Sequence, residues 1–264
     1  MLQKIIEHKK SLIERDKSSL PLDVLKKATR HFPVSSIIQK TRENDFIVIA
    51  EAKKASPSGG IFRKKYNPAR IAISYEKAGA TAISVLTEER YFLGCIEHLK
   101  QVKKAVKIPV VAKDFFIDEY QIYQAYVSGA DCILLILKIL IDDEFLHLAK
   151  VARKLNLEIL VEIQNKEELS RFFKISGVNS GMLLGINSRN LDTPEINTAA
   201  TISLLSLIKD IKIPVIAESG ITNSRTLVEL RKAGASGVLI GTYLLRAHSP
   251  GKALKQLLKE MRKG

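Results

Sequence analysis

Residues 107–112 read Lys-Ile-Pro-Val-Val-Ala, and residues 212–217 read Lys-Ile-Pro-Val-Ile-Ala, so one short apolar segment recurs 105 positions later. The same offset carries Gly129-Ala130 onto Gly234-Ala235, and Gly79-Ala80 is a third copy of the Gly-Ala step. A glycine that ends a helix in the left-handed conformation, followed by an alanine that opens a strand, is a typical helix-to-strand connection. The repeat therefore predicts recurring strand–helix units.

Short apolar runs lie along most of the chain, separated by longer stretches with helical periodicity. Most of these runs are continuously apolar, which is typical of parallel strands that helices cover. Their starts lie roughly 25–35 residues apart, a spacing that suits one strand–helix unit each. The eight runs are Phe46–Ala50, Ala80–Leu86, Pro109–Ala112, Cys132–Leu137, Glu158–Val161, Met182–Ile186, Pro214–Ala217 and Gly237–Ile240. Eight units predict an α/β fold of the (β/α)8 TIM-barrel class.

The first 45 residues differ from the repeated units, because Ile5, Ile6, Leu12 and Ile13 recur at helical spacing and Pro21 starts a second helical pattern. We expect a single barrel domain over residues 1–264, with residues 1–45 as a helical N-terminal extension. An open doubly wound sheet is the alternative. It is disfavoured because no GxGxxG follows the first run and no GxxxxGK[ST] occurs in the sequence.

The charge is strongly unbalanced, with 42 Lys and Arg against 28 Asp and Glu, a formal net charge of +14. This favours an anionic partner, which is a nucleic acid, an acidic membrane surface, or a phosphorylated or carboxylated small molecule. Composition alone does not choose among the three.

The two cysteines, Cys95 and Cys132, have neither disulfide-framework nor zinc spacing, which indicates a reducing compartment. The segment Met1–Lys40 has no apolar leader. The longest apolar run, Cys132–Ile141, is about half the roughly 20 residues that a membrane span needs. We expect a cytoplasmic protein with no membrane association, and a monomer.

Polar residues follow the apolar runs at the strand ends where barrels of this class place their active sites. Glu51 and Lys53 are two positions apart and therefore point to the same side. Lys113 and Glu162 follow directly on apolar runs, where a charge lies at the barrel mouth or is buried at real cost. The converging set is Glu51, Lys53, Lys113, Glu162, Asn187, Arg189, Glu218 and Ser219. Cations and carboxylates together suit acid–base chemistry on an anionic substrate.

Gly220 and Gly241 follow the last two strands and leave backbone N–H groups accessible to a ligand. In these barrels that region commonly holds a phosphate. Ser219 and Thr242 add hydroxyl donors. We therefore expect a phosphate-binding site there, with two ordinary tight turns as the alternative.

None of the histidines, His8, His31, His98, His147 and His248, follows a strand at this end, so we expect neither a histidine mechanism nor a metal site. Glu88, Glu89 and Arg90 are interpreted as a solvated loop.

Several motifs, in order, resemble those of the indole-3-glycerol phosphate synthases. The strand 1 signature E-x-K-x-x-S-P-S is matched by residues 51–58, and the later motifs follow in register over nearly the whole chain. These later motifs are Ile83–Glu88 with Tyr91-Phe92, Pro109–Phe115, Leu160–Glu162, Gly185–Leu191 and Ala217–Ile221. Thr242 departs from the family pattern, which often has Glu there.

The resemblance implies conversion of 1-(2-carboxyphenylamino)-1-deoxyribulose 5-phosphate into indole-3-glycerol phosphate, carbon dioxide and water in tryptophan biosynthesis. It implies a carboxy-lyase with no cofactor. Lys113 would be the general acid, with its pKa lowered by neighbouring cations, and Glu162 the general base. The remaining implied catalytic residues are Glu51, Lys53, Asn187 and Ser219. The implied substrate-binding residues are Ser56, Phe92, Phe115, Arg189, Glu218, Gly220, Gly241 and Thr242.

Two other functions remain open at this point. A related phosphate-binding barrel, such as phosphoribosylanthranilate isomerase or the tryptophan synthase α chain, would share the phosphate site but not need the Lys53/Lys113 pair with Glu162. A basic nucleic-acid binder would need a recognisable module, and the sequence contains none. The prediction is therefore a phosphorylated anionic small molecule as partner, and no nucleic acid.

Overall fold

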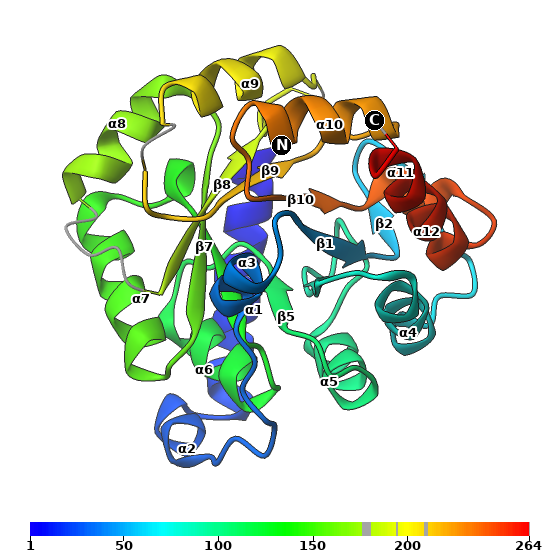
Figure 1. Cartoon of the computed structure of the whole chain (residues 1–264). Coiled ribbons are helices and arrows are strands. Elements are labelled where there is room, and N and C mark those ends of the chain that lie inside the picture. Colours follow the sequence, from blue (N-terminus) through cyan, green and yellow to red (C-terminus); the bar gives the residue numbers. More distant parts are fainter. Residues whose placement is uncertain (176–180, 194, 209–210, 264) are drawn as a thin grey trace.

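The computed structural model describes residues 1–175, 181–193, 195–208 and 211–263, and in them parallel strands form one closed barrel (Figure 1). Around the barrel the strands follow the order β1-β10-β9-β8-β7-β6-β5-β4. They are β1 (Ile47–Ala52), β4 (Ala82–Leu86), β5 (Val110–Lys113), β6 (Cys132–Ile136), β7 (Glu158–Ile163), β8 (Met182–Asn187), β9 (Val215–Glu218) and β10 (Gly237–Ile240). The predicted TIM barrel is confirmed, and each apolar run corresponds to one strand.

A helix follows each strand and packs on the outside of the barrel, so the helices form a ring around it (Figure 1). These helices are α4 (Pro68–Ala78), α5 (Ile96–Ala105), α6 (Glu119–Val127), α7 (Asp142–Lys154), α8 (Lys166–Ile175), α9 (Thr198–Ser206), α10 (Ser224–Lys232) and α12 (Pro250–Met261). Short elements interrupt three of the connections: a hairpin of β2 (Ala55–Ser56) and β3 (Gly60–Ile61), the 3-10 turn η1 (Leu137–Ile139), and α11 (Thr242–Arg246).

The repeated Gly-Ala step has the predicted conformation in all three copies. Gly79, Gly129 and Gly234 have φ values of 100°, 96° and 106°. The N–H of each following alanine donates to a carbonyl five residues earlier, as in Ala80 to Tyr75 at 3.0 Å. This bond satisfies a carbonyl of the last helical turn and turns the chain into the next strand.

The N-terminal residues are helical, as predicted, and form α1 (Leu2–Ser19), α2 (Leu22–Lys27) and α3 (Ile37–Glu43). α2 lies outside the ring next to α6 (Figure 1). Glu158, the first residue of β7, accepts hydrogen bonds from the backbone N–H groups of Ile37 at 2.7 Å and Ile38 at 3.2 Å. A carboxylate at a helix N-terminus satisfies N–H groups that have no partner in the helix, so Glu158 fixes α3 at the amino end of the barrel.

Strand side chains alternate between two hydrophobic cores, because successive residues point to opposite faces. In β1, Val48 and Ala50 belong to the layer between strands and helices, whereas Ile47 and Ile49 belong to the barrel interior. The next inward position along β1 is Glu51. The interior is therefore apolar over most of its depth and becomes polar at the carboxyl end of the strands.

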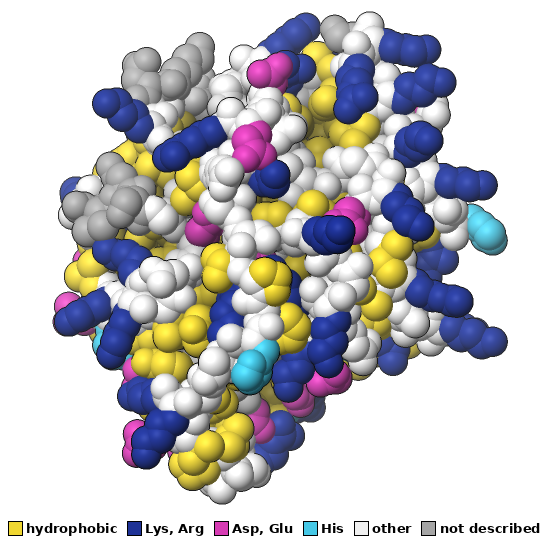
Figure 2. All heavy atoms as spheres, turned by 60° about the horizontal axis from the view of Figure 1, so that its bottom comes forward, with side chains coloured by type: hydrophobic (Ala, Val, Ile, Leu, Met, Phe, Trp, Pro, Cys, Tyr) yellow, Lys and Arg dark blue, Asp and Glu magenta, His cyan; other side chains and the backbone are white. Residues whose placement is uncertain are grey.

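Lys and Arg side chains are spread over the face shown in Figure 2, where acidic side chains are fewer. Among the described residues, no helix has the length and apolar content needed to cross a membrane.

Candidate active site

A cavity of about 900 Å³ opens at the carboxyl ends of the strands and lies within the size range of small-molecule sites. All fourteen residues expected at the site line this one cavity. They are Glu51, Lys53, Ser56, Phe92, Lys113, Phe115, Glu162, Asn187, Arg189, Glu218, Ser219, Gly220, Gly241 and Thr242. The strands extend one or two residues beyond several of the apolar runs, so the strand backbone itself positions Glu51, Lys113, Glu162, Asn187 and Glu218.

Lys113 lies between two buried carboxylates from other strands. Its Nζ is 2.9 Å from Oε2 of Glu218 and 3.2 Å from Oε2 of Glu162. Lys113 and Glu218 are the last residues of β5 and β9, 105 positions apart. The repeat detected in the sequence therefore places a cation and an anion at equivalent strand ends, where they meet across the barrel.

These neighbours determine the protonation of Lys113. Burial alone would lower the pKa of the Lys113 ammonium, but the negative charges of Glu218, Glu162 and Glu51 outweigh it and raise the pKa above the usual value. The expectation that cations lower the pKa of Lys113 is therefore wrong, because the groups in direct contact with its ammonium are carboxylates.

Glu218 is 1% exposed in its side chain, and burial raises its pKa to about 7 against the opposing effect of Lys113. Its Oε1 has no hydrogen-bond partner. A Cβ on Gly185, in the neighbouring strand, would lie 2.3 Å from this Oε1. Since real Cβ atoms do not approach an oxygen so closely, the carboxylate can occupy this place only because residue 185 is glycine.

Glu51 and Lys53 form a second ion pair at the end of β1, which confirms that they point to the same side. Lys53 also lies over the ring of Phe62, with Nζ 5.5 Å from the ring centroid. A Cβ on Gly241 would lie 2.1 Å from Oε1 of Glu51. Gly241 thus has a packing role at Glu51 as well as its expected place near a phosphate.

Asn187 and Arg189 continue from β8 into the loop above the barrel. The Nδ2 of Asn187 donates to Oε1 of Glu162 at 3.0 Å, and its Oδ1 accepts the backbone N–H of Arg189 at 3.0 Å. The Arg189 guanidinium donates to Oγ of Ser58 at 3.2 Å. Asn187 therefore orients Glu162, and Arg189 bridges to the loop that follows β1.

The region expected to hold a phosphate is built from the loops after β9 and β10, and Ser56 lines the same cavity. Ser219 and Gly220 both have positive φ, at 65° and 74°. The left-handed conformation is strained for a serine. Thr242 begins α11, and Arg246 at the other end of that helix also lines the cavity.

The rings of Phe92 and Phe115 lie on the same side of the cavity, with centroids 6.3 Å apart and planes tilted by 43°. This is within the usual range of interacting aromatic pairs.

Sequence reasoning missed three parts of the site. Glu88 is fully buried, and its carboxylate accepts the backbone N–H groups of Arg90, Tyr91 and Phe92 at 3.1, 2.6 and 2.9 Å. The expectation of a solvated Glu88 is therefore wrong: this residue shapes the loop that carries Phe92. Arg246 was missed because it stands on a helix rather than at a strand end. Met1, Leu2 and Ile5 also line the cavity. The family resemblance implies that the N-terminal extension lies near the barrel mouth, but neither it nor the strand-end rule indicates these three residues.

None of the five histidines lines this cavity, and the described residues contain no cluster of His, Cys, Asp and Glu that could hold a metal ion.

Comparison with known proteins decides the family. The sequence profile described as Indole-3-glycerol phosphate synthase matches residues 2–257. This chain belongs to the indole-3-glycerol phosphate synthase family. A relative of that name from Campylobacter jejuni is 43% identical over 262 residues, covering 98% of this chain and 100% of the relative. Another from Prochlorococcus marinus is 43% identical over 253 residues, covering 93% of this chain and 85% of the relative.

Solved structures outside the family share the fold. A protein described as KGPDC from Streptococcus mutans superposes with a TM-score of 0.64 at 14% identity, covering 83% of this chain and 99% of that one. Orotidine 5'-phosphate decarboxylase from Pyrococcus horikoshii gives a TM-score of 0.59 at 16% identity, with 81% and 99% covered. These likenesses show the barrel alone.

Proposed function

We propose that the chain is an indole-3-glycerol phosphate synthase, a carboxy-lyase of tryptophan biosynthesis, and that Lys113 is its general acid. The substrate is 1-(2-carboxyphenylamino)-1-deoxyribulose 5-phosphate, and the products are indole-3-glycerol phosphate, carbon dioxide and water. The observation that carries the assignment of Lys113 is its ammonium group, which lies between Glu162 and Glu218 in the cavity at the carboxyl ends of the strands.

Ring closure begins when the aromatic carbon that bears the carboxylate attacks the ketone carbon. Negative charge then develops on the ketone oxygen, and Lys113 donates its proton there. The raised pKa of Lys113 keeps it charged before the reaction. Because an alkoxide is more basic than an amine, the proton still moves towards the oxygen as the new carbon–carbon bond forms. A fixed cation in a partly buried site stabilises the same charge electrostatically.

Two further steps complete the reaction. The carbon–carboxylate bond breaks, carbon dioxide leaves, and the electron pair restores the aromatic ring. The hydroxyl left from the ketone then departs as water, which requires an acid at the oxygen and a base for the proton that is lost. Glu162 is the base, oriented by Asn187 at 3.0 Å. Lys53, paired with Glu51, binds the substrate carboxylate and serves as the acid for dehydration.

The other residues hold the substrate. Ser56, Gly220, Gly241 and Thr242, with Ser219 beside them, bind the phosphate through backbone N–H and hydroxyl groups. Phe92 and Phe115 contact the aromatic ring, Arg189 holds the loop above it, and Glu218 keeps Lys113 in place at 2.9 Å.

Purified protein should produce indole fluorescence from this substrate, and the absence of tryptophan gives a low protein background. Lys113→Ala should reduce turnover roughly 10²–10⁴-fold, the usual contribution of one catalytic proton donor, while the thermal unfolding profile remains cooperative. Phosphoribosylanthranilate supplied alone serves as the control substrate. The proposal would be refuted if the protein isomerised phosphoribosylanthranilate but closed no indole ring. It would also be refuted if Lys113→Ala formed indole-3-glycerol phosphate at the wild-type rate.

A further inference from the structure

A lysine lies in the middle of the buried face of α1. Ile5, Lys9 and Ile13 are spaced four residues apart, so they share one side of the helix, and all three are buried. The ammonium of Lys9 is 2.8 Å from Oδ1 of Asp114, and the two side chains are 6% and 9% exposed. A leucine at this position would pack with no cost of burying a charge. A buried ion pair is weak evidence for stability, and its best-attested use is to fix one arrangement of the elements it joins.

Asp114 connects this ion pair to the active site. It directly follows Lys113, and its carboxylate also accepts the Oγ1–H of Thr87 at 2.7 Å and the backbone N–H of Phe115 at 2.8 Å. The backbone N–H of Thr87 in turn donates to the carbonyl of Lys113 at 3.1 Å. Asp114 therefore ties together the ends of β4 and β5 and fixes the turn from which the Phe115 side chain enters the cavity.

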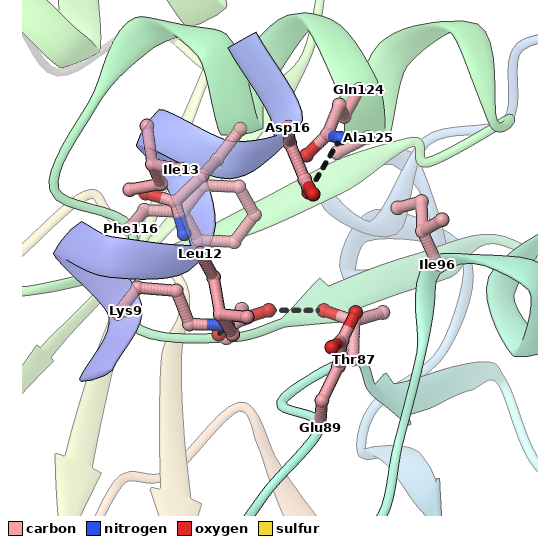
Figure 3. Close-up of a pocket in the computed structure, with 12 residues that line it drawn as sticks. Lys9, Leu12, Ile13, Asp16, Thr87, Glu89, Ile96, Phe116, Gln124 and Ala125 are labelled. Atoms are coloured by element: carbon pink, nitrogen blue, oxygen red, sulfur yellow. Dashed lines mark hydrogen bonds and ion pairs between the residues drawn. The ribbon is translucent and has the colours of Figure 1, made fainter. Parts of the chain in front are cut away.

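The helix that carries Lys9 also forms part of the cavity wall. Met1, Leu2 and Ile5 line the cavity one to two helical turns before Lys9. Figure 3 shows Lys9 extending from α1 towards Thr87, beside a small second cavity of about 50 Å³. The carboxyl-terminal half of α1 is held differently: Lys17 pairs with Asp118 at 2.7 Å, and Tyr120 donates to the carbonyls of Asp16 and Leu20. These contacts join the end of α1 to the start of α6, and the residues that make them do not line the cavity.

We propose that Lys9 is a positioning residue that fastens α1 against Asp114, so that the first turns of α1 and the Phe115 turn together complete the binding wall for the substrate. The proposal rests on the proposed function. Lys113 itself is held by Glu162 and Glu218, and neither contact involves Lys9. Loss of Lys9 should therefore weaken substrate binding far more than the chemical step.

The test compares Lys9→Met with Lys9→Arg, which keeps the cation, and with Lys17→Met, which breaks the ion pair that the same helix makes with Asp118. For Lys9→Met we expect KM for 1-(2-carboxyphenylamino)-1-deoxyribulose 5-phosphate to rise about tenfold with kcat within threefold of wild type. Lys9→Arg and Lys17→Met should keep KM within threefold. Backbone amides of residues 5–13 should exchange hydrogen at least tenfold faster in Lys9→Met, with no change in the barrel strands.

Lys9→Met leaves a buried carboxylate without its cation and could fail to fold, so the double variant Lys9→Met/Asp114→Asn removes both charges. We expect it to fold and to keep the raised KM. An unchanged KM in both variants, or an equal rise in KM in Lys17→Met, would overturn the proposal, as would unchanged hydrogen exchange in residues 5–13. Hydrogen exchange is measured without substrate. An inactive wild-type protein would therefore refute the proposed function, and the exchange rates of residues 5–13 would still decide whether Lys9 fastens α1.

Discussion

The interaction between Lys113 and Glu218 predicts how the pH dependence of the enzyme changes when Glu218 becomes glutamine. The substitution keeps the shape of the side chain and removes one negative charge 2.9 Å from Nζ of Lys113. Glu162 remains at 3.2 Å, so the ammonium keeps one of its two direct partners.

The size of the effect follows from the distance. Two unit charges 2.9 Å apart in a medium of effective dielectric constant about 20 attract by about 6 kcal/mol. At about 1.36 kcal/mol per pKa unit, this is an upper bound of about four units. Water in the cavity reduces the attraction, and opposite charges at such distances usually shift a pKa by about 1–3 units. The pKa of Lys113 should therefore fall by about 1–3 units in Glu218→Gln.

The assay is the dependence of kcat/KM on pH, followed by indole fluorescence. A general acid must be protonated, so activity is lost as the pH rises through the pKa of Lys113. Glu218→Gln should move this alkaline limb to lower pH by about 1–3 units. On the acid side, burial raises the pKa of Glu218 to about 7, so the carboxylate becomes neutral below that pH and Lys113 loses a counter-charge. The resulting inflection near pH 7 in the wild type should be absent from the variant.

Glu89→Gln is the control, because Glu89 is an exposed carboxylate that does not line the catalytic cavity. Its profile should overlay that of the wild type. If the alkaline limb of Glu218→Gln stays in place or moves to higher pH, the carboxylates do not set the pKa of Lys113, and the reasoning is refuted.

Three further predictions follow from contacts elsewhere in the molecule. Gly185→Ala should lower kcat about a hundredfold. The added Cβ would lie 2.3 Å from Oε1 of Glu218 and would displace this carboxylate, which holds Lys113, and a shift of about 1 Å in the position of Lys113 can cost that much. A kcat within threefold of wild type would contradict the prediction. Asp131→Asn should lower the free energy of unfolding in urea by about 3–5 kcal/mol, because the buried Asp131 pairs with Arg30 and Lys103. Since these pairs lie at the amino end of the barrel, kcat/KM should stay within twofold of wild type. A loss of stability below about 1 kcal/mol would count against this role of Asp131. Raising the salt concentration from about 0.02 M to about 0.3 M should reduce kcat/KM several-fold. The net charge of +14 attracts a substrate that carries a carboxylate and a phosphate, and salt screens this attraction. A kcat/KM that is independent of salt would exclude electrostatic steering.

The residues at the strand ends were predictable as one site, because a parallel barrel brings the carboxyl ends of all its strands to the same edge. Each polar residue that follows an apolar run lies at the carboxyl edge of the closed sheet, so Lys113, Glu162 and Glu218 had to converge once the fold was predicted. The side on which Glu51 and Lys53 lie followed from the two-residue period of a strand.

The protonation of those residues was not predictable in the same way. A pKa depends on which charges lie within a few ångströms. Knowing that a residue lies at a strand end does not reveal which charged side chains contact it. The sequence-based expectation counted cations near Lys113, whereas the structure places Glu162 and Glu218 against its ammonium and raises its pKa. Glu88 shows the same limit. Glu88, Glu89 and Arg90 are three consecutive charged residues, but only Glu88 is buried, because its carboxylate is turned inwards and accepts backbone N–H groups.

By itself, the sequence determined the number and order of the strand–helix units, the glycine-capped connections, and the edge of the sheet at which the polar residues gather, because all three follow from local periodicity and chirality. Only the tertiary structure decided which charges touch, which glycines make room for the carboxylates of Glu51 and Glu218, and that the first residues of α1 line the cavity while Lys9 on the same helix pairs with Asp114. Those features depend on contacts between residues roughly 30 to 190 positions apart, and no pattern of neighbouring residues encodes a distance across the barrel.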